Sequence, residues 1–144
     1  MCIFTIYTQR HENRFEKAGT TALVSAKAQA EPRDGNQLER DFGDLLETQF
    51  RRGEIAWYAF QRLTFKLGDD CRYSPDWNVV TASGLLIQYE CKGTKVVKGK
   101  AKLYARDDAM VKIRSAASIF WWAKFVVVWR FKGVWQFDEV KAVT

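Results

Sequence analysis

Residues 37–52 carry the pattern that most limits how this chain can fold. At 100° per residue, five apolar side chains fall within an arc of about 140°, and most charged side chains lie on the other side. Gly53 follows as a natural helix end. The pattern therefore predicts an amphipathic helix that packs on a second layer through its apolar face. The five apolar residues are Leu38, Phe42, Leu45, Leu46 and Phe50.

The rest of the chain adds strand patterns and a second helix, which together predict a mixed α/β domain. Three strands follow the first helix as an antiparallel meander, and a buried, β-branched and aromatic strand with a partner follows the second helix. The predicted strands cover residues 59–67, 73–80, 85–92, 124–131 and 134–137, with a turn at 81–84 and a second helix at about 106–117.

A single domain accounts for the length of 144 residues. Hydrophobic residues make up 47% of the chain and aromatic residues 15%, which is enough apolar surface to offset the entropy of ordering a compact fold. We expect residues 37–144 to form the domain and residues 1–36 an N-terminal arm or lead-in. Trp121, Trp122 and Trp129 are expected in the core around the buried strand, whereas Trp57 and Trp77 are expected to be exposed.

The formal charge of +6 favours a polyanionic partner such as nucleic acid or an anionic surface. Three cysteines without CxxC spacing and one histidine do not form a zinc site, and a reducing cytoplasm is the simpler setting. The start of the chain lacks the pattern of a secretion signal. The apolar run at residues 119–129 is interrupted by Lys124 and is too short to span a bilayer. We therefore expect a cytoplasmic protein with no membrane partner.

Asp76, Glu90 and Lys92 form the pattern that points to chemistry. The two acids lie on neighbouring predicted strands, joined by a turn that can bring their carboxylates together. Lys92 shares a strand face with Glu90, because side chains alternate along a strand, and Cys91 points to the other face. Two carboxylates and a backbone carbonyl are suitable ligands for Mg²⁺, and an ammonium beside them can position water or neutralise a phosphate. The same Glu-x-Lys spacing also occurs on solvated edge strands.

Glu39 lies inside the apolar arc of the first helix, between Leu46 and Phe50. An acid there is costly to bury unless it meets a cation or shares a proton. If the helix packs with Glu39 directed at Asp76 and Glu90, the metal ion held by those two acids would be that cation. The alternative is that Glu39 reaches water at the first turn, where the helix dipole favours an acid.

A basic segment follows Lys92 directly and contains no acid. With glycines for flexibility, it could follow a phosphate backbone and contribute sequence-independent affinity. A solvated lysine loop is the ordinary alternative. Two basic residues of the second helix could add phosphate contacts. The predicted nucleic-acid-binding residues are Lys95, Lys98, Lys100, Lys102, Arg106, Lys112 and Arg114.

In this order, Glu39, the segment 73–77 around Pro75-Asp76 and the segment 89–93 around Glu90-Cys91-Lys92 resemble the PD-(D/E)xK nuclease superfamily. More narrowly, the chain resembles small phage-encoded nucleases and phage junction-resolving endonucleases. The resemblance covers about residues 37–129. Trp77 stands where Phe is common in these families, and Cys91 where a β-branched residue is more usual.

This resemblance implies a restriction-endonuclease-like fold, in which a mixed central sheet is flanked by helices. It implies a Mg²⁺ site, with Mn²⁺ as a substitute, held by Asp76, Glu90 and the Cys91 carbonyl. Lys92 would position water, Glu39 would be a further acid that acts directly or through water, and Lys112 would be an auxiliary basic residue. The expected reaction is hydrolysis of a DNA phosphodiester that leaves a 5′-phosphate, in the cytoplasm of the bacterial host if the chain is phage-encoded.

The resemblance leaves the form of the DNA open. A Holliday-junction-like substrate would call for a two-fold symmetric homodimer, because a junction presents two symmetric cuts. The alternative function is a nucleic-acid-binding module that keeps a nuclease-like fold but does not cut.

Overall fold

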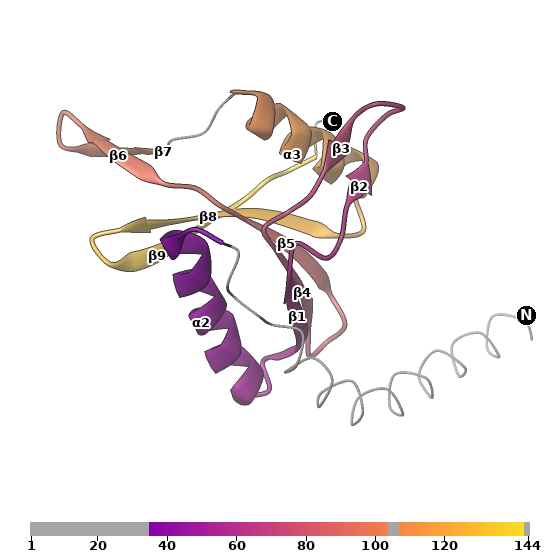
Figure 1. The fold of residues 1–144 in the computed structure, drawn as a ribbon, viewed down its shortest axis with the longest axis horizontal. Helices are drawn as coiled ribbons and strands as arrows, with labels where there is room; N and C mark the ends of the chain where they lie inside the picture. Colours follow the sequence, from indigo (N-terminus) through magenta and orange to yellow (C-terminus); the bar gives the residue numbers. More distant parts are fainter. Residues whose placement is uncertain (1–34, 104–106, 143–144) are drawn as a thin grey trace, which may run out of the picture.

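The structure is a computed structural model that describes residues 35–103 and 107–142. Five strands form one sheet, two short hairpins stand apart from it, and two helices complete the described part (Figure 1). In chain order the elements are α2 (Gln37–Arg51), β1 (Ile55–Phe60), β2 (Phe65–Lys66), β3 (Arg72–Tyr73), β4 (Trp77–Thr81), β5 (Leu86–Cys91), β6 (Thr94–Val97), β7 (Lys100–Leu103), α3 (Asp107–Ile119), β8 (Lys124–Phe131) and β9 (Val134–Glu139).

The central sheet has the order β1-β4-β5-β8-β9 and is mixed. β1, β4 and β5 are antiparallel neighbours, as the predicted meander requires. β8 lies parallel to β5 and antiparallel to β9. A parallel pair needs a crossover, and here the β6–β7 hairpin and α3 both belong to it. The mixed α/β prediction is confirmed.

Residues of β8 show how the two helices share the sheet. Alternate side chains of a strand face opposite sides. Val126 and Val128 pack in the cluster that contains α2, and Phe125 and Val127 pack in the cluster that contains α3. All four are buried, because a helix covers each face. This explains the continuous apolar run that predicted a buried strand.

The predicted first helix is confirmed as α2. Its N-terminus is a capping box, in which Asn36 and Glu39 exchange hydrogen bonds between side chain and backbone. The helix lies close to β4 at Gly43, where an added Cβ would come within 2.6 Å of the Trp77 ring. Trp77 is therefore buried, with only 1% of its surface exposed, and the expectation that it faces solvent is wrong.

Trp121 and Trp122 also differ from expectation, since they are 78% and 55% exposed. Both belong to the turn between α3 and β8, which ends before the covered part of the sheet begins. The core position expected for these two tryptophans is wrong. Trp129 and Trp57 are half-buried.

Two predicted strands are broken in the structure. The strand expected at 59–67 is the end of β1 followed by β2, separated by a turn in which Gln61 has a φ of 46°. The strand expected at 73–80 divides into β3 and β4, because Pro75 lacks the N–H that a sheet ladder needs. The second helix starts at Asp107 and ends at Ile119, so it runs slightly beyond the predicted end.

Residues 1–34, which include most of the predicted N-terminal arm, and Arg106 lie outside the described residues. Within the described ranges, no helix is both long and apolar enough to cross a membrane.

Candidate active site

Asp76 and Glu90 are brought together by the pairing of β4 with β5. Trp77 pairs with Tyr89 at the end of this antiparallel ladder. Asp76, which precedes Trp77, and Glu90, which follows Tyr89, therefore lie opposite one another. Asp76 Oδ2 accepts a hydrogen bond of 2.8 Å from the Cys91 backbone N–H. Both carboxylates are buried, each residue being 9% exposed. The predicted convergence of the two acids is present.

The break before β4 is what directs Asp76 toward β5. Pro75 interrupts the strand, and the Asp76 carbonyl accepts a hydrogen bond from the Gln61 N–H, which holds the backbone against the end of β1. The side chain is then held from the other direction by Cys91. The Pro-Asp pair therefore positions a carboxylate by ending one strand pairing and beginning another.

Glu90 makes two contacts through its two oxygens. Its Oε1 lies 2.7 Å from Lys92 Nζ, in a partly buried ion pair. Its Oε2 accepts a hydrogen bond of 3.0 Å from the Tyr73 hydroxyl. Glu90 and Lys92 lie two positions apart on β5 and its extension, as the strand alternation predicts. The ammonium therefore lies at the carboxylate pair.

The electrostatics of the pair follow from its burial. Desolvation raises the pKa of Asp76 to about 7, the negative charge of Glu90 adds to the rise, and the Cys91 N–H opposes it. Burial, and then the charge of Glu90, also raise the pKa of Tyr73 well above its ordinary value, so this phenol remains a hydrogen-bond donor. Two buried acids that repel one another form a site that a cation would stabilise.

The backbone of Cys91 adds an oxygen on the same side. The N–H and C=O of one strand residue point to the same edge, and the Cys91 N–H points to Asp76. β4 pairs with β5 only as far as Tyr89, so the Cys91 carbonyl lies beyond that ladder. Two carboxylates and a carbonyl are the hard oxygen ligands that Mg²⁺ takes together with several waters.

Among residues 35–103 and 107–142, no group of three or more His, Cys, Asp or Glu side chains is arranged to hold a metal ion. A cation at this site would thus rely on Asp76, Glu90, the Cys91 carbonyl and water. This donor set fits Mg²⁺ or Mn²⁺, which accept incomplete protein coordination, and does not fit a structural zinc.

Glu39 lies near the pair but has other partners. Its carboxylate accepts hydrogen bonds from the backbone N–H and the side-chain amide of Asn36, at 2.9 and 2.7 Å. Its carbonyl accepts a bond of 3.0 Å from Trp77 Nε1, which fixes the start of α2 against β4. The charge of Glu39 contributes to the raised pKa of Asp76. Direct participation in metal binding would require the capping contacts to open.

The predicted basic residues divide between two places. Lys95, Lys98, Lys100 and Lys102 are exposed on the β6–β7 hairpin, which was predicted as a flexible segment. Lys112 and Arg114 are exposed on α3.

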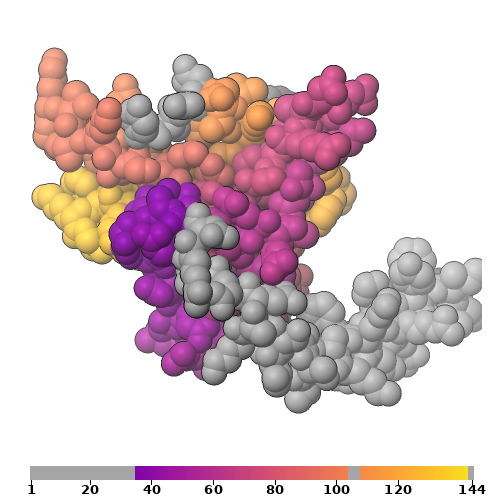
Figure 2. Space-filling view, viewed as in Figure 1, coloured from indigo at the N-terminus to yellow at the C-terminus, as the bar shows by residue number. Residues whose placement is uncertain are grey.

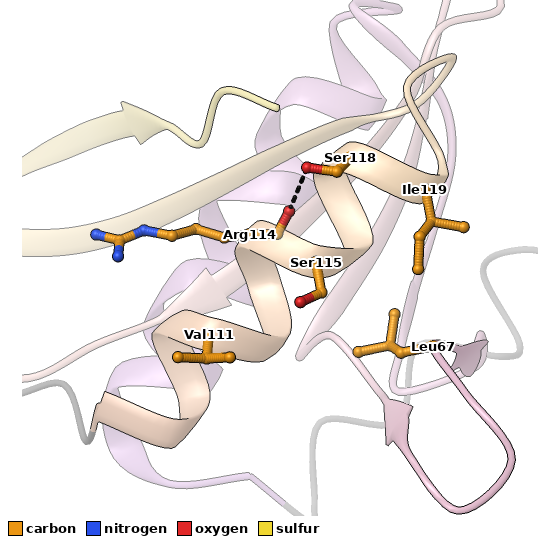
Figure 3. A pocket seen from close by; sticks show the side chains of 6 residues that line it. All are labelled: Leu67, Val111, Arg114, Ser115, Ser118 and Ile119. Atoms are coloured by element: carbon orange, nitrogen blue, oxygen red, sulfur yellow. Dashed lines mark hydrogen bonds between the residues drawn. The ribbon is translucent and has the colours of Figure 1, made fainter. Parts of the chain in front are cut away.

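Arg114 borders a hollow of about 500 Å³ between α3 and the β2–β3 hairpin. Figure 3 shows its side chain pointing away from Leu67 and Ile119 on the opposite side of that hollow. No residue of the carboxylate pair lines the hollow. The structure therefore brings together Asp76, Glu90, Cys91 and Lys92, with Glu39 close by. The cations of α3 and the lysines of the hairpin belong to different elements.

The sequence patterns did not identify Tyr73, which contacts the site, or Asn78, which supports the turn beside it. Tyr73 holds Glu90. Asn78 is fully buried, and its Oδ1 accepts hydrogen bonds from the backbone of Arg62 and Leu63, which fixes the turn after β1. The signal available in the sequence was a tyrosine two residues before Pro75 and a polar residue inside an apolar strand.

Comparisons with protein-family models, with curated proteins and with solved structures found no match to this chain.

Proposed function

We propose that this chain is a metal-dependent DNA endonuclease of the PD-(D/E)xK type, built on a restriction-endonuclease-like sheet. The observation that carries the proposal is the pair of buried carboxylates on adjacent strands, with Lys92 Nζ 2.7 Å from one of them. Asp76 and Glu90 repel one another and share one desolvated space, which favours a bound cation. A cluster of exposed lysines begins at Lys95, three residues after Lys92.

In this proposal Asp76, Glu90 and the Cys91 carbonyl hold Mg²⁺ or Mn²⁺. When bound, the metal supplies Lewis acidity and an activated water for attack on a DNA phosphodiester. The chain's own residues orient the site. The Cys91 N–H orients the Asp76 carboxylate, and the Tyr73 hydroxyl orients the Glu90 carboxylate. Lys92 places a positive charge where a phosphate oxygen gains negative charge during the reaction.

Two further residues have supporting roles in the proposal. Glu39 acts through water or after release from its cap, since its carboxylate is held by Asn36. Lys112 is an auxiliary basic residue on an exposed part of α3.

The test is cleavage of labelled duplex, single-stranded and four-way-junction DNA in Mg²⁺, Mn²⁺ or EDTA. The native chain is compared with Asp76→Asn and Lys92→Ala, and with the matched exposed controls Asp69→Asn and Lys66→Ala. Product that needs metal, is lost in both site variants and persists in both controls supports the nuclease. Junction-specific cutting would also require a dimer, which sedimentation on the junction measures.

A non-catalytic nucleic-acid-binding module is the second candidate. The observation in its favour is that the lysines of β6 and β7 stand on a hairpin of their own and do not depend on the carboxylates. DNA binding that persists in Asp76→Asn, with no product from the native chain in any metal, would establish this function and overturn the nuclease.

A further inference from the structure

The β6–β7 hairpin is a regular two-stranded ribbon. Val97 pairs with Lys100 at its tip, and the two residues between them form the turn. Lys98 and Gly99 both have positive φ, at 51° and 73°, as in the turns whose twist matches a pair of strands. Figure 1 shows the ribbon extending away from the central sheet, and Figure 2 shows it as a protruding part of the surface.

The two faces of this ribbon differ in charge. Residues that pair across an antiparallel ladder share a face. Lys95 and Lys102 therefore lie on one face with Val97 and Lys100, and all four are exposed. The other face contains Thr94, Ala101 and Leu103, which are half-buried, and the exposed Val96. The lysine face is thus the one directed to solvent.

A ribbon of this kind is unfavourable in isolation. A two-stranded hairpin is only marginally stable alone in water. Lys100 and Lys102 gather positive charge on one exposed face of this hairpin. A polyanion lying along the lysine face would add the contacts that two strands alone lack.

The base of the ribbon is fixed relative to the carboxylate pair. Only Gly93 separates Lys92 from the first residue of β6. The Thr94 hydroxyl donates a hydrogen bond of 3.1 Å to the Arg130 carbonyl of β8. DNA held by the ribbon would therefore lie at a set position from Lys92.

We propose that the β6–β7 hairpin is a ribbon that enters the major groove of duplex DNA and presents the adjoining strand to the site. This inference rests on the proposed function, and it names duplex B-form DNA as the substrate class. The major groove admits a two-stranded β-ribbon. The exposed Val97 on the lysine face is suited to thymine methyl groups, and the lysines to the flanking phosphates.

The composition of the ribbon argues against other nucleic acids. Residues 94–103 contain no Phe, Tyr or Trp, and single strands are bound mainly by stacking of bases on aromatic side chains. The major groove of duplex RNA is deep and too narrow for side-chain access. Duplex DNA is the polyanion that fits both the shape and the residues of this hairpin.

The test measures binding of the full chain to a labelled duplex by fluorescence anisotropy in EDTA, so that no cutting occurs. The first comparison is the double variant Lys100→Gln and Lys102→Gln against the control pair Lys66→Gln and Lys124→Gln. Both pairs remove two positive charges, but the control pair lies in β2 and at the far end of β8. Loss of two phosphate contacts reduces the slope of log affinity against log salt by about 2. An equal reduction in the control pair overturns the inference.

The second comparison blocks one groove at a time. Glucosylated hydroxymethylcytosine fills the major groove of the duplex, and netropsin fills the minor groove. We expect at least a tenfold weaker affinity for the glucosylated duplex and little change with netropsin. The reverse pattern, or equal affinity for single-stranded DNA, overturns the inference.

The inference and the nuclease proposal can fail separately. Major-groove binding by the native chain and by Asp76→Asn, with no product in any metal, retains the ribbon and removes the nuclease. Metal-dependent cutting that is insensitive to glucosylation retains the nuclease and removes the ribbon.

Discussion

Replacing Asp76 by Asn should stabilise the fold at neutral pH in the absence of metal. Burial and the neighbouring Glu90 charge raise the pKa of Asp76 from 3.8 to about 7. Between these values the folded chain holds a proton that the unfolded chain has released, so stability falls as the pH rises. The amide of Asn has no charge to desolvate, and its oxygen can still accept the Cys91 N–H.

The magnitude follows from the two pKa values. At about 1.4 kcal/mol per pH unit, the difference between 3.8 and about 7 corresponds to a cost of up to about 4 kcal/mol above pH 7. We expect the free energy of unfolding of Asp76→Asn to exceed that of the native chain by about 2–4 kcal/mol at pH 8 and by less than about 1 kcal/mol at pH 4. Such a gain from removing a proposed catalytic group is the usual exchange of stability for function.

Urea unfolding followed by tryptophan fluorescence in EDTA at pH 4, 6 and 8 measures this difference. Asp69→Asn is the control, because the Asp69 side chain is fully exposed and should leave stability unchanged. Added Mg²⁺ should raise the stability of the native chain more than that of Asp76→Asn, since a ligand stabilises the state that binds it. A difference in the free energy of unfolding between the native chain and Asp76→Asn that is the same at pH 4 and at pH 8 would refute the reasoning.

Three other substitutions test the supports of the site. Tyr73→Phe leaves the buried Glu90 with one donor fewer, so urea unfolding should show a loss of about 1–3 kcal/mol and metal-dependent cleavage should slow; unchanged values in both assays would contradict this. Asn36→Ala removes the capping box and should cost about 1 kcal/mol, measured by thermal unfolding against the exposed Thr48→Ala. Gly43→Ala should lower stability by about 1–3 kcal/mol despite its better helix propensity, because its Cβ would meet the Trp77 ring at 2.6 Å; a rise in Tm would show that the helix can move away.

Elements with a clear local period were predictable from the sequence. The apolar arc of α2, the β-branched run of β8 and the alternation that puts Glu90 and Lys92 on one face all depend on a few neighbouring residues. The convergence of Asp76 with Glu90 was predictable for the same reason, because a short turn joins their strands.

Features that depend on turns and on distant contacts were not predictable. Gln61 and Lys98 adopt positive φ without being glycine, and these two residues end β1 and form the β6–β7 turn. The burial of Trp77 depends on the absence of a side chain at Gly43, which lies on another element. The parallel pairing of β5 with β8 also carries no local signal, because the crossover between them is long.

The crossover explains why the site and the basic ribbon lie together. β5 ends at Cys91, and the chain must leave the sheet there before it can return as the parallel strand β8. The β6–β7 ribbon is the first part of the segment that connects β5 to β8. Its lysines therefore begin close to the end of β5. The same topology therefore places Glu90 and Lys92 at the end of β5 and the lysine-bearing ribbon directly after them.

Arg130 joins this exit to the rest of the fold. Its carbonyl accepts the hydrogen bond from Thr94 at the base of the ribbon. Its guanidinium donates a hydrogen bond of 3.0 Å to Asp41 of α2 and lies 4.4 Å from the centre of the Trp135 ring in β9. Arg130 therefore connects the base of the ribbon with α2 and with the sheet. It lies two positions along β8 from Val128, the partner of Cys91. A fixed base is what the proposed nuclease would require, because it would have to hold a phosphodiester in place against the carboxylates.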